Sequence, residues 1–131
     1  MDRETEQHLE QILTLARQSF SAVEIIKYDI SEERALLKLK CTCEHRDVFV
    51  TEVITQRERW YSYYLLESKA ILIGLDNYPD RPALRLKYGD TFGQHLHEPI
   101  PHIHTENKQK LELTEEQTFA DFMQMVSDFC R

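Results

Sequence analysis

The sequence predicts an α+β fold, an antiparallel β-meander of five to six strands flanked by an N-terminal and a C-terminal helix. Apolar residues recur with a helical period near both ends of the chain and with a period of two between them. The segments that join the central runs are short and polar, which suits hairpins and leaves no room for crossover helices. The length of 131 residues is that of a single domain.

The two terminal helices are predicted from single apolar stripes. The first is expected over Glu4–Phe20, and the last over Glu115–Cys130. Thr114, with Gln117 three residues later, fits a capping box at the start of the last helix. We interpret both stripes as surfaces that face the core.

Five central segments have the alternation, or the β-branched and aromatic content, of strands. They are Ala22–Ile30, Ala35–Cys41, Val48–Ile54, Arg59–Leu66 and Lys69–Leu75. Alternation over Leu84–Tyr88 allows a sixth strand. A long loop is expected over Gly89–Thr105, and loops of that length often carry function.

Net charge and hydropathy limit the classes of partner that this chain could bind. The formal net charge of −7 argues against a protein that coats duplex DNA, because such binding needs a basic face, but it leaves room for a small RNA-cutting site. No apolar run approaches the roughly 20 residues that span a bilayer, and the first residues do not resemble a secretory signal. We therefore expect a cytoplasmic domain with no membrane partner, and both a monomer and a homo-oligomer are compatible with the sequence.

The cysteine count is odd. Cys41 and Cys43 lie two apart on an expected strand and so share one face, while Cys130 lies near the end of the chain. We interpret Cys41 and Cys43 as two small side chains that face the core. A disulfide between them, or a metal site, is the alternative.

Four of the six histidines fall in one ten-residue window and form two His-x-His pairs. They are His95, His97, His102 and His104. Imidazole titrates near neutral pH and is a common metal ligand, so acid–base catalysis and metal binding both fit this cluster. Solvated loop histidines are the third interpretation.

Two carboxylates and two tyrosines complete the candidate set. Glu52 and Asp76 sit on expected strands, and Glu52 shares a strand face with core residues, where an unpaired charge is costly. Tyr61 and Tyr63 lie on one face of the fourth strand. Each also has a plain interpretation: Glu52 as a solvated residue, Asp76 as part of an Asx-turn and the tyrosines as packing.

Four elements follow one another along the chain: an acid on a strand (Glu52), then Tyr61-Ser62-Tyr63, the turn Asp76-Asn77-Tyr78-Pro79 and a closing Pro101-His102-Ile103-His104. Through these elements the stretch from Tyr61 onward resembles the TumE-like family of bacterial toxin–antitoxin proteins. The resemblance covers about half the chain. Tyr64 stands where the family usually has histidine, Gly74 where it has a basic residue, and Asp80-Arg81 where it has histidines.

The resemblance implies a toxin with a cognate antitoxin protein as partner. Combined with the histidines, it leads to the first functional hypothesis, a metal-independent ribonuclease. His102 and His104 would be base and acid, held by Glu52 or Asp76 and assisted by Tyr63. Substrate contacts would come from Arg59, Arg81 and Tyr61.

Two further hypotheses stay open. One is a metal-dependent hydrolase in which His95 and His97 join His102 and His104, with Asp76 or Glu98, around zinc, manganese or nickel. The other is a non-catalytic module that binds a protein partner through a sheet edge or the strand containing Trp60 and Tyr64.

Overall fold

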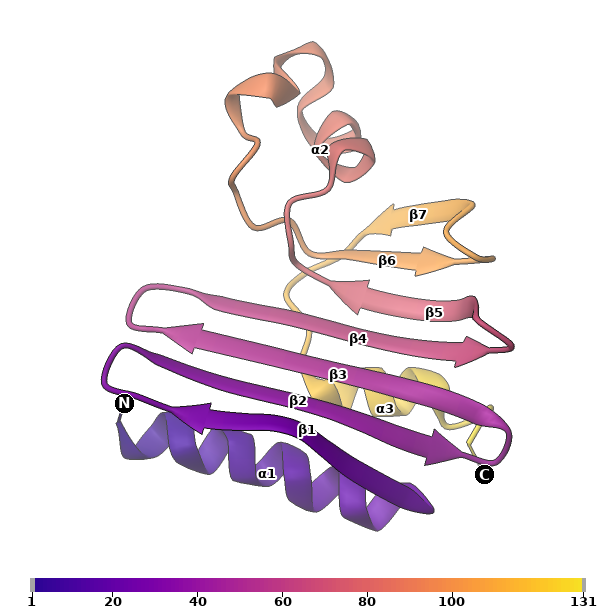
Figure 1. Ribbon diagram of the computed structural model, residues 1–131. Helices are drawn as coiled ribbons and strands as arrows, with labels where there is room; N and C mark the ends of the chain where they lie inside the picture. The colour runs from indigo at the N-terminus through magenta and orange to yellow at the C-terminus, as the bar shows by residue number, and fades with distance from the viewer. Residues whose placement is uncertain (1, 131) are drawn as a thin grey trace.

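The computed structural model describes residues 2–130 and has the expected α+β meander, extended to seven antiparallel strands in sequential order (Figure 1). The strands are β1 (Ala22–Ile30), β2 (Arg34–Cys43), β3 (Arg46–Thr55), β4 (Arg59–Glu67), β5 (Ala70–Asp76), β6 (His102–Thr105) and β7 (Lys110–Leu113). The helices are α1 (Arg3–Ser19), α2 (Arg81–Tyr88), the short 3₁₀ helix η1 (Gly89–Gln94) and α3 (Phe119–Val126). None of the helices within residues 2–130 is both long and apolar enough to cross a bilayer.

Helices α1 and α3 lie against the same face of the sheet (Figure 1). The main core forms between them and the inward side chains of β2–β5, such as Leu37, Val50 and Leu65. We call the other side of the sheet the open face. A smaller core of Ala83, Leu84 and Ile100 joins α2 and η1 to Leu111 of β7.

The region after β5 differs most from expectation. Leu84–Tyr88 is not a strand but part of helix α2, which Asp80 begins by accepting a hydrogen bond from the Ala83 amide. The expected loop over Gly89–Thr105 contains η1 and strand β6, so the second His-x-His pair lies inside the sheet. Backbone pairing with β5 therefore orders histidines that sequence alone left in a loop.

The last helix starts later than expected. Thr118 caps it, in a capping box with Asp121, and the expected start at Glu115 is wrong. The segment before Thr118 is extended because β4 holds it there. The Tyr61 hydroxyl accepts a hydrogen bond from the Gln117 amide, and the Arg59 guanidinium donates one to the Gln117 carbonyl.

The cysteines separate into one buried thiol and one disulfide. Cys41 faces the core as expected, and burial raises the pKa of its thiol to about 12. Cys43 is not a free core thiol, because it forms a disulfide with Cys130 across a Cα–Cα distance of 5.4 Å. The bond attaches the end of the chain to the end of β2.

Candidate functional site

The sheet divides the expected site residues between its two faces. Glu52 pairs with Tyr61 across β3 and β4, and both side chains lie in the helix-covered core. Asp76 pairs with His102 across β5 and β6, on the open face. Successive residues of a strand point to opposite sides, so the histidines meet Asp76 and not Glu52, the other acid expected to hold them.

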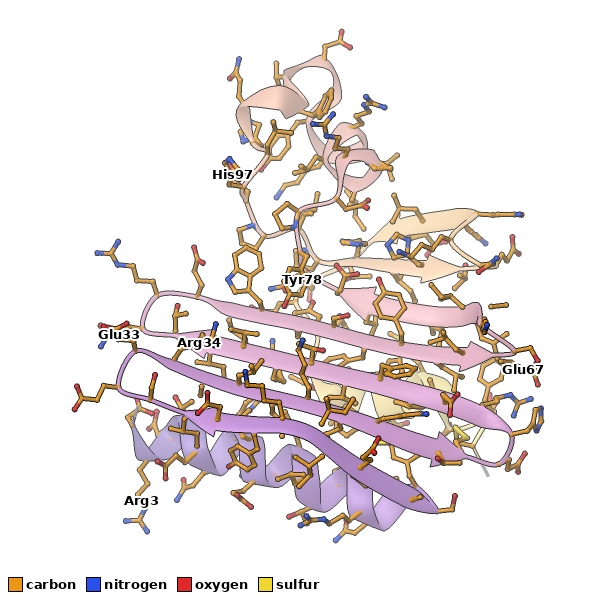
Figure 2. The ribbon with its side chains drawn as sticks, in the orientation of Figure 1. Arg3, Glu33, Arg34, Glu67, Tyr78 and His97 are labelled. Carbon is orange, nitrogen blue, oxygen red and sulfur yellow. A yellow bond between two sulfur atoms is a disulfide. The ribbon has the colours of Figure 1, made fainter. Side chains whose placement is uncertain are left out.

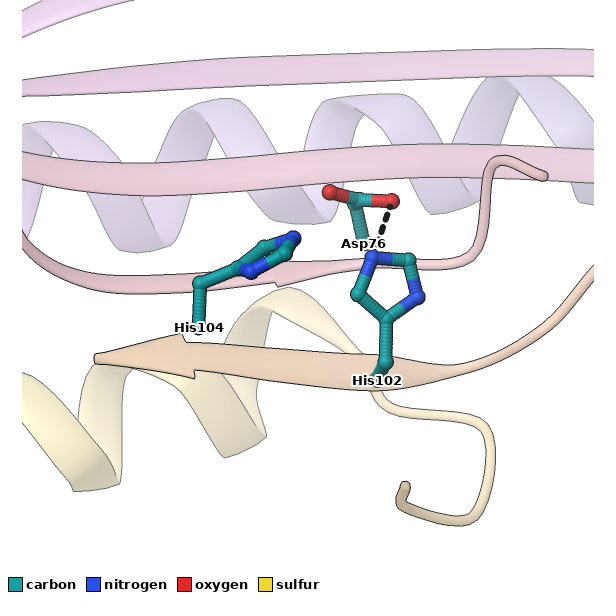
Figure 3. Close-up of side chains that lie close together, drawn as sticks. All are labelled: Asp76, His102 and His104. Atoms are coloured by element: carbon teal, nitrogen blue, oxygen red, sulfur yellow. Dashed lines mark ion pairs between the residues drawn. The ribbon is translucent and has the colours of Figure 1, made fainter. Parts of the chain in front are cut away.

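On the open face, Asp76, His102 and His104 form one cluster (Figure 3). His102 and His104 alternate along β6 and therefore project together, while the end of β5 brings Asp76 opposite His102. Their ligand-type atoms all lie within 4.8 Å of one another, and all three residues are buried. We call this group the Asp–His–His cluster.

Asp76 is held as a carboxylate from several sides. Its Oδ2 accepts a hydrogen bond from the Tyr64 hydroxyl, and its Oδ1 accepts one from the Tyr78 amide at 3.0 Å. The Tyr78 contact is the expected Asx-turn, so the turn and the cluster use the same side chain. Burial opposes ionisation, yet the contacts with His102, Tyr64 and Tyr78 keep the pKa of Asp76 below its usual range.

His102 is only 1% exposed and has an acceptor near each ring nitrogen. Nδ1 donates to the Ile100 carbonyl, and Nε2 lies 3.2 Å from Asp76 Oδ1 without the alignment of a hydrogen bond. Burial alone would lower the pKa of His102, but the contact with Asp76 and its charge raise it above the ordinary value. The ring is therefore suited to be an imidazolium near neutral pH, with an Nε2 proton that is not firmly hydrogen bonded.

His104 has the opposite character. Its ring meets that of His102 edge-on, with centroids 4.7 Å apart. Burial, and then the positive charge of His102, lower the pKa of His104. Its Nδ1 is buried and forms no hydrogen bond with any group in residues 2–130. The cluster thus places an imidazole with a lowered pKa and an unsatisfied buried nitrogen beside an imidazole with a raised pKa.

Tyr64 and Gly74 fit together beneath this cluster. A Cβ on Gly74 would lie 2.2 Å from Cε1 of the Tyr64 ring, so the ring occupies the space that any larger side chain would need. That position lets the Tyr64 hydroxyl reach Asp76. Tyr64 and Gly74, which both differ from the TumE-like pattern, therefore belong to a single packing arrangement.

The helix-covered group has a different chemistry. Glu52 is fully buried, and its Oε1 lies 2.7 Å from His8 Nε2 and accepts hydrogen bonds from Arg59. Arg59 also donates to the Tyr63 hydroxyl, at 2.8 Å, and lies over the Tyr61 ring. Burial and the charge of Glu52 raise the pKa of Tyr63, which keeps its hydroxyl neutral.

This group acts as a scaffold. It joins α1 through His8, the sheet through Glu52 and the approach to α3 through Arg59, which also pairs with Glu116 at 3.0 Å. Tyr61 and Tyr63 are both fully buried, so neither can stack on a substrate in this state. Glu52, Tyr63, Arg59 and Tyr61 are therefore separated by the sheet from the Asp–His–His cluster.

The other expected residues also lie apart from the cluster. His95 stacks on Tyr88 and lies 2.6 Å from Glu98, outside the three-residue group. His97 lines a separate groove with Trp60 and Tyr78. Arg81 is exposed in the first turn of α2. A four-histidine metal site is therefore not formed.

Sequence reasoning missed the parts that support the cluster. Asn77 accepts a hydrogen bond from the Tyr61 amide, donates to the Arg59 carbonyl and accepts one from the Ile100 amide through its backbone. It thereby fixes the end of β5 against the segment that enters β6. Its place directly after Asp76 in a turn with proline was the only available signal.

No family model, curated protein or solved structure matches the chain.

Proposed function

We propose that the chain is a toxin-like ribonuclease whose reaction centre is the Asp–His–His cluster. The observation that carries the proposal is the contact of two adjacent imidazoles with pKa shifts in opposite directions: His102, beside Asp76, has a raised pKa, and His104 has a lowered one. Cleavage of RNA without a metal needs one group to take a proton and another to supply one.

The residues divide the reaction as follows. His104 takes the proton of a ribose 2′-hydroxyl through its free Nδ1, and the oxygen attacks the adjacent phosphorus. His102 gives its Nε2 proton to the departing 5′-oxygen, which leaves a 2′,3′-cyclic phosphate and a 5′-hydroxyl. Asp76 holds the positive charge of His102 and is therefore a positioning residue. Because both rings are almost fully covered, the reaction requires a local opening of the site.

The test is cleavage of a fluorescently labelled RNA by the purified chain, with His102→Gln and His104→Gln as variants. Each variant should lose at least 100-fold in rate, because general acid and base catalysis each contribute about 10²–10⁴. His95→Gln is the matched control, since it removes an imidazole that lies outside the cluster, and should cleave normally. Equal rates in all four proteins would reject the proposal.

The biological setting follows from the resemblance to TumE-like toxins. Production of the wild-type chain in a bacterium should slow growth, and His102→Gln should relieve the effect. In that setting a cognate antitoxin would be the protein partner. Equally slow growth with both proteins would show that the toxicity does not depend on the cluster.

A second candidate is a metal centre on the same three residues, which the burial of the cluster favours. Two imidazoles and one carboxylate with nearby ligand atoms, and a free nitrogen on His104, match the donors that zinc uses in proteins. Calorimetric titration with Zn²⁺ decides between the two candidates. Stoichiometric binding that is lost in His104→Gln, with cleavage that requires the metal, would favour the metal centre. Metal-independent cleavage would favour acid–base chemistry.

A further inference from the structure

A groove opens on the same side of the sheet as the Asp–His–His cluster, beside the turn that follows Asp76. Its volume is about 600 Å³, and its lining residues are Val53, Glu58, Trp60, Tyr78, Pro79 and His97. Figure 2 shows Tyr78 near the end of β5 and His97 beyond the sheet, in the segment between η1 and β6. None of the chemistry described above uses this groove.

The groove is adjacent to the cluster through the backbone. Tyr78, which lines the groove, donates its amide to Asp76 Oδ1. Trp60 lies on β4, opposite Val53 of β3, and on the same strand face as Ser62, which pairs with Asp76. A nucleotide in the groove would therefore lie next to the turn that carries the reaction centre.

The groove combines a planar aromatic wall with a fixed hydrogen-bond acceptor. The rings of Trp60 and Tyr78 stack with centroids 5.5 Å apart and an angle of 26°. The Trp60 indole donates a hydrogen bond to Glu58 Oε2 at 3.0 Å, which orients the carboxylate at the edge of this wall. Bases in single strands are recognised by such stacking together with hydrogen bonds to their Watson–Crick edge.

We propose that this groove binds a nucleobase and prefers guanine. Guanine presents two adjacent donors, N1–H and the N2 amino group, to which a carboxylate can accept in parallel. Adenine and cytosine place a ring nitrogen acceptor beside their amino donor, and uracil flanks its single donor with carbonyl oxygens. The two oxygens of Glu58 therefore match the edge of guanine, and they face an acceptor on the edge of each other base.

The proposal rests on the proposed function for its biological meaning, but its test does not need catalysis. Trp60 is the only tryptophan in the chain, so its fluorescence reports directly on the groove. Guanosine 3′-monophosphate, which has no phosphodiester bond to cleave, should quench the fluorescence with a dissociation constant at least tenfold lower than those of the adenosine, cytidine and uridine 3′-monophosphates.

Two variants sharpen the experiment. Glu58→Gln replaces one acceptor oxygen by a donor amide and should bring guanosine and adenosine monophosphate within about twofold of each other. Glu44→Gln, in the β2–β3 turn at the opposite end of the sheet, removes the same charge and should keep the guanine preference. Equal quenching by all four nucleotides, no quenching at all, or a preference that survives Glu58→Gln would overturn the proposal.

The outcomes separate this proposal from the ribonuclease proposal. Guanine binding without RNA cleavage would leave the groove assignment standing and reject the reaction centre. Cleavage with no preference for guanine, together with equal quenching by all four nucleotides, would support the reaction centre and reject the groove assignment.

Discussion

Replacing Asp76 by Asn tests the charge pairing at the centre of the cluster. The amide keeps the shape of the side chain, and its oxygen can still accept from the Tyr78 amide, but the negative charge beside His102 is gone. Without that charge, burial dominates, and the pKa of His102 should fall from above its ordinary value of 6.5 to below it. The sign of the shift reverses, although the fold stays the same.

The cost in stability should depend on pH. In the wild type the raised pKa of His102 stabilises the fold fully below about pH 6.5, and this contribution is lost as pH rises through the folded value. In Asp76→Asn, the His102 ring must lose its proton when the chain folds. At about pH 5, which is below its ordinary pKa, this lowers the free energy of unfolding by roughly 2 kcal/mol. Adding about 1 kcal/mol for the weaker hydrogen bonding gives a loss of at least about 3 kcal/mol at that pH, because the wild-type stabilisation by His102 is lost as well. At about pH 8.5 only the 1 kcal/mol is left.

Urea unfolding of both proteins across this range measures the difference, and NMR titration of the imidazole protons follows His102 directly. Asp47→Asn is the matched control, since Asp47 is a β3 residue away from the cluster, and its effect should be small and flat with pH. A pH-independent difference between Asp76→Asn and wild type, or an unchanged pKa of His102, would refute the charge pairing.

The remaining predictions concern the reaction centre, the packing beneath it, the scaffold and the disulfide. The rate of RNA cleavage should follow a bell-shaped pH profile. Its acid limb, from His104, should lie below the ordinary histidine pKa of 6.5, and its alkaline limb, from His102, should lie above it. A profile with a single limb would contradict the assignment. Gly74→Ala should cost about 1–3 kcal/mol in urea unfolding because its Cβ displaces the Tyr64 ring, and the double variant with Tyr64→Ala should cost less than the two single changes together; additive costs would count against the packing. Glu52→Gln should cost about 3 kcal/mol by unpairing Arg59 and yet leave both pH limbs of cleavage in place; a shifted limb would connect the two faces. Cys43→Ser should lower the unfolding free energy by about 4 kcal/mol, because the disulfide closes a loop with a sequence separation of 87. A reducing agent should lower the stability of the wild type by the same amount and leave that of the variant unchanged.

The meander could be predicted because its information is local. Alternation and short polar connections identify β1–β5, and each hairpin joins neighbours in the chain. Strands β6 and β7 are four residues each, too short for alternation to be visible. They form because β5 offers an unpaired edge, which is information that no local window contains.

The candidate site was predicted in part for the same reason. His102, His104 and Asp76 were identified from residue type and spacing, and the pairing of β5 with β6 brings them together. Glu52 and Tyr63 have equally suggestive chemistry, but the strand period places them on the other face. Residue type cannot distinguish these cases until the register of every strand is known, because a shift of one residue exchanges the faces.

Each of the two polar groups retains a buried side-chain atom without a hydrogen-bond partner, Glu52 Oε2 in one and His104 Nδ1 in the other, so the groups are distinguished by what they connect. Glu52 has a cationic partner in Arg59, a histidine beside it and a direct link to two helices, so disrupting it loosens the fold. The Asp–His–His cluster connects β5 with β6 and includes a buried ring nitrogen on His104 that nothing in residues 2–130 satisfies. A buried polar atom without a partner costs free energy, and a fold that needed His104 only for packing would be more stable with an apolar residue there. We therefore expect His104→Leu to raise the unfolding free energy while abolishing cleavage, a combination that a purely structural histidine would not produce.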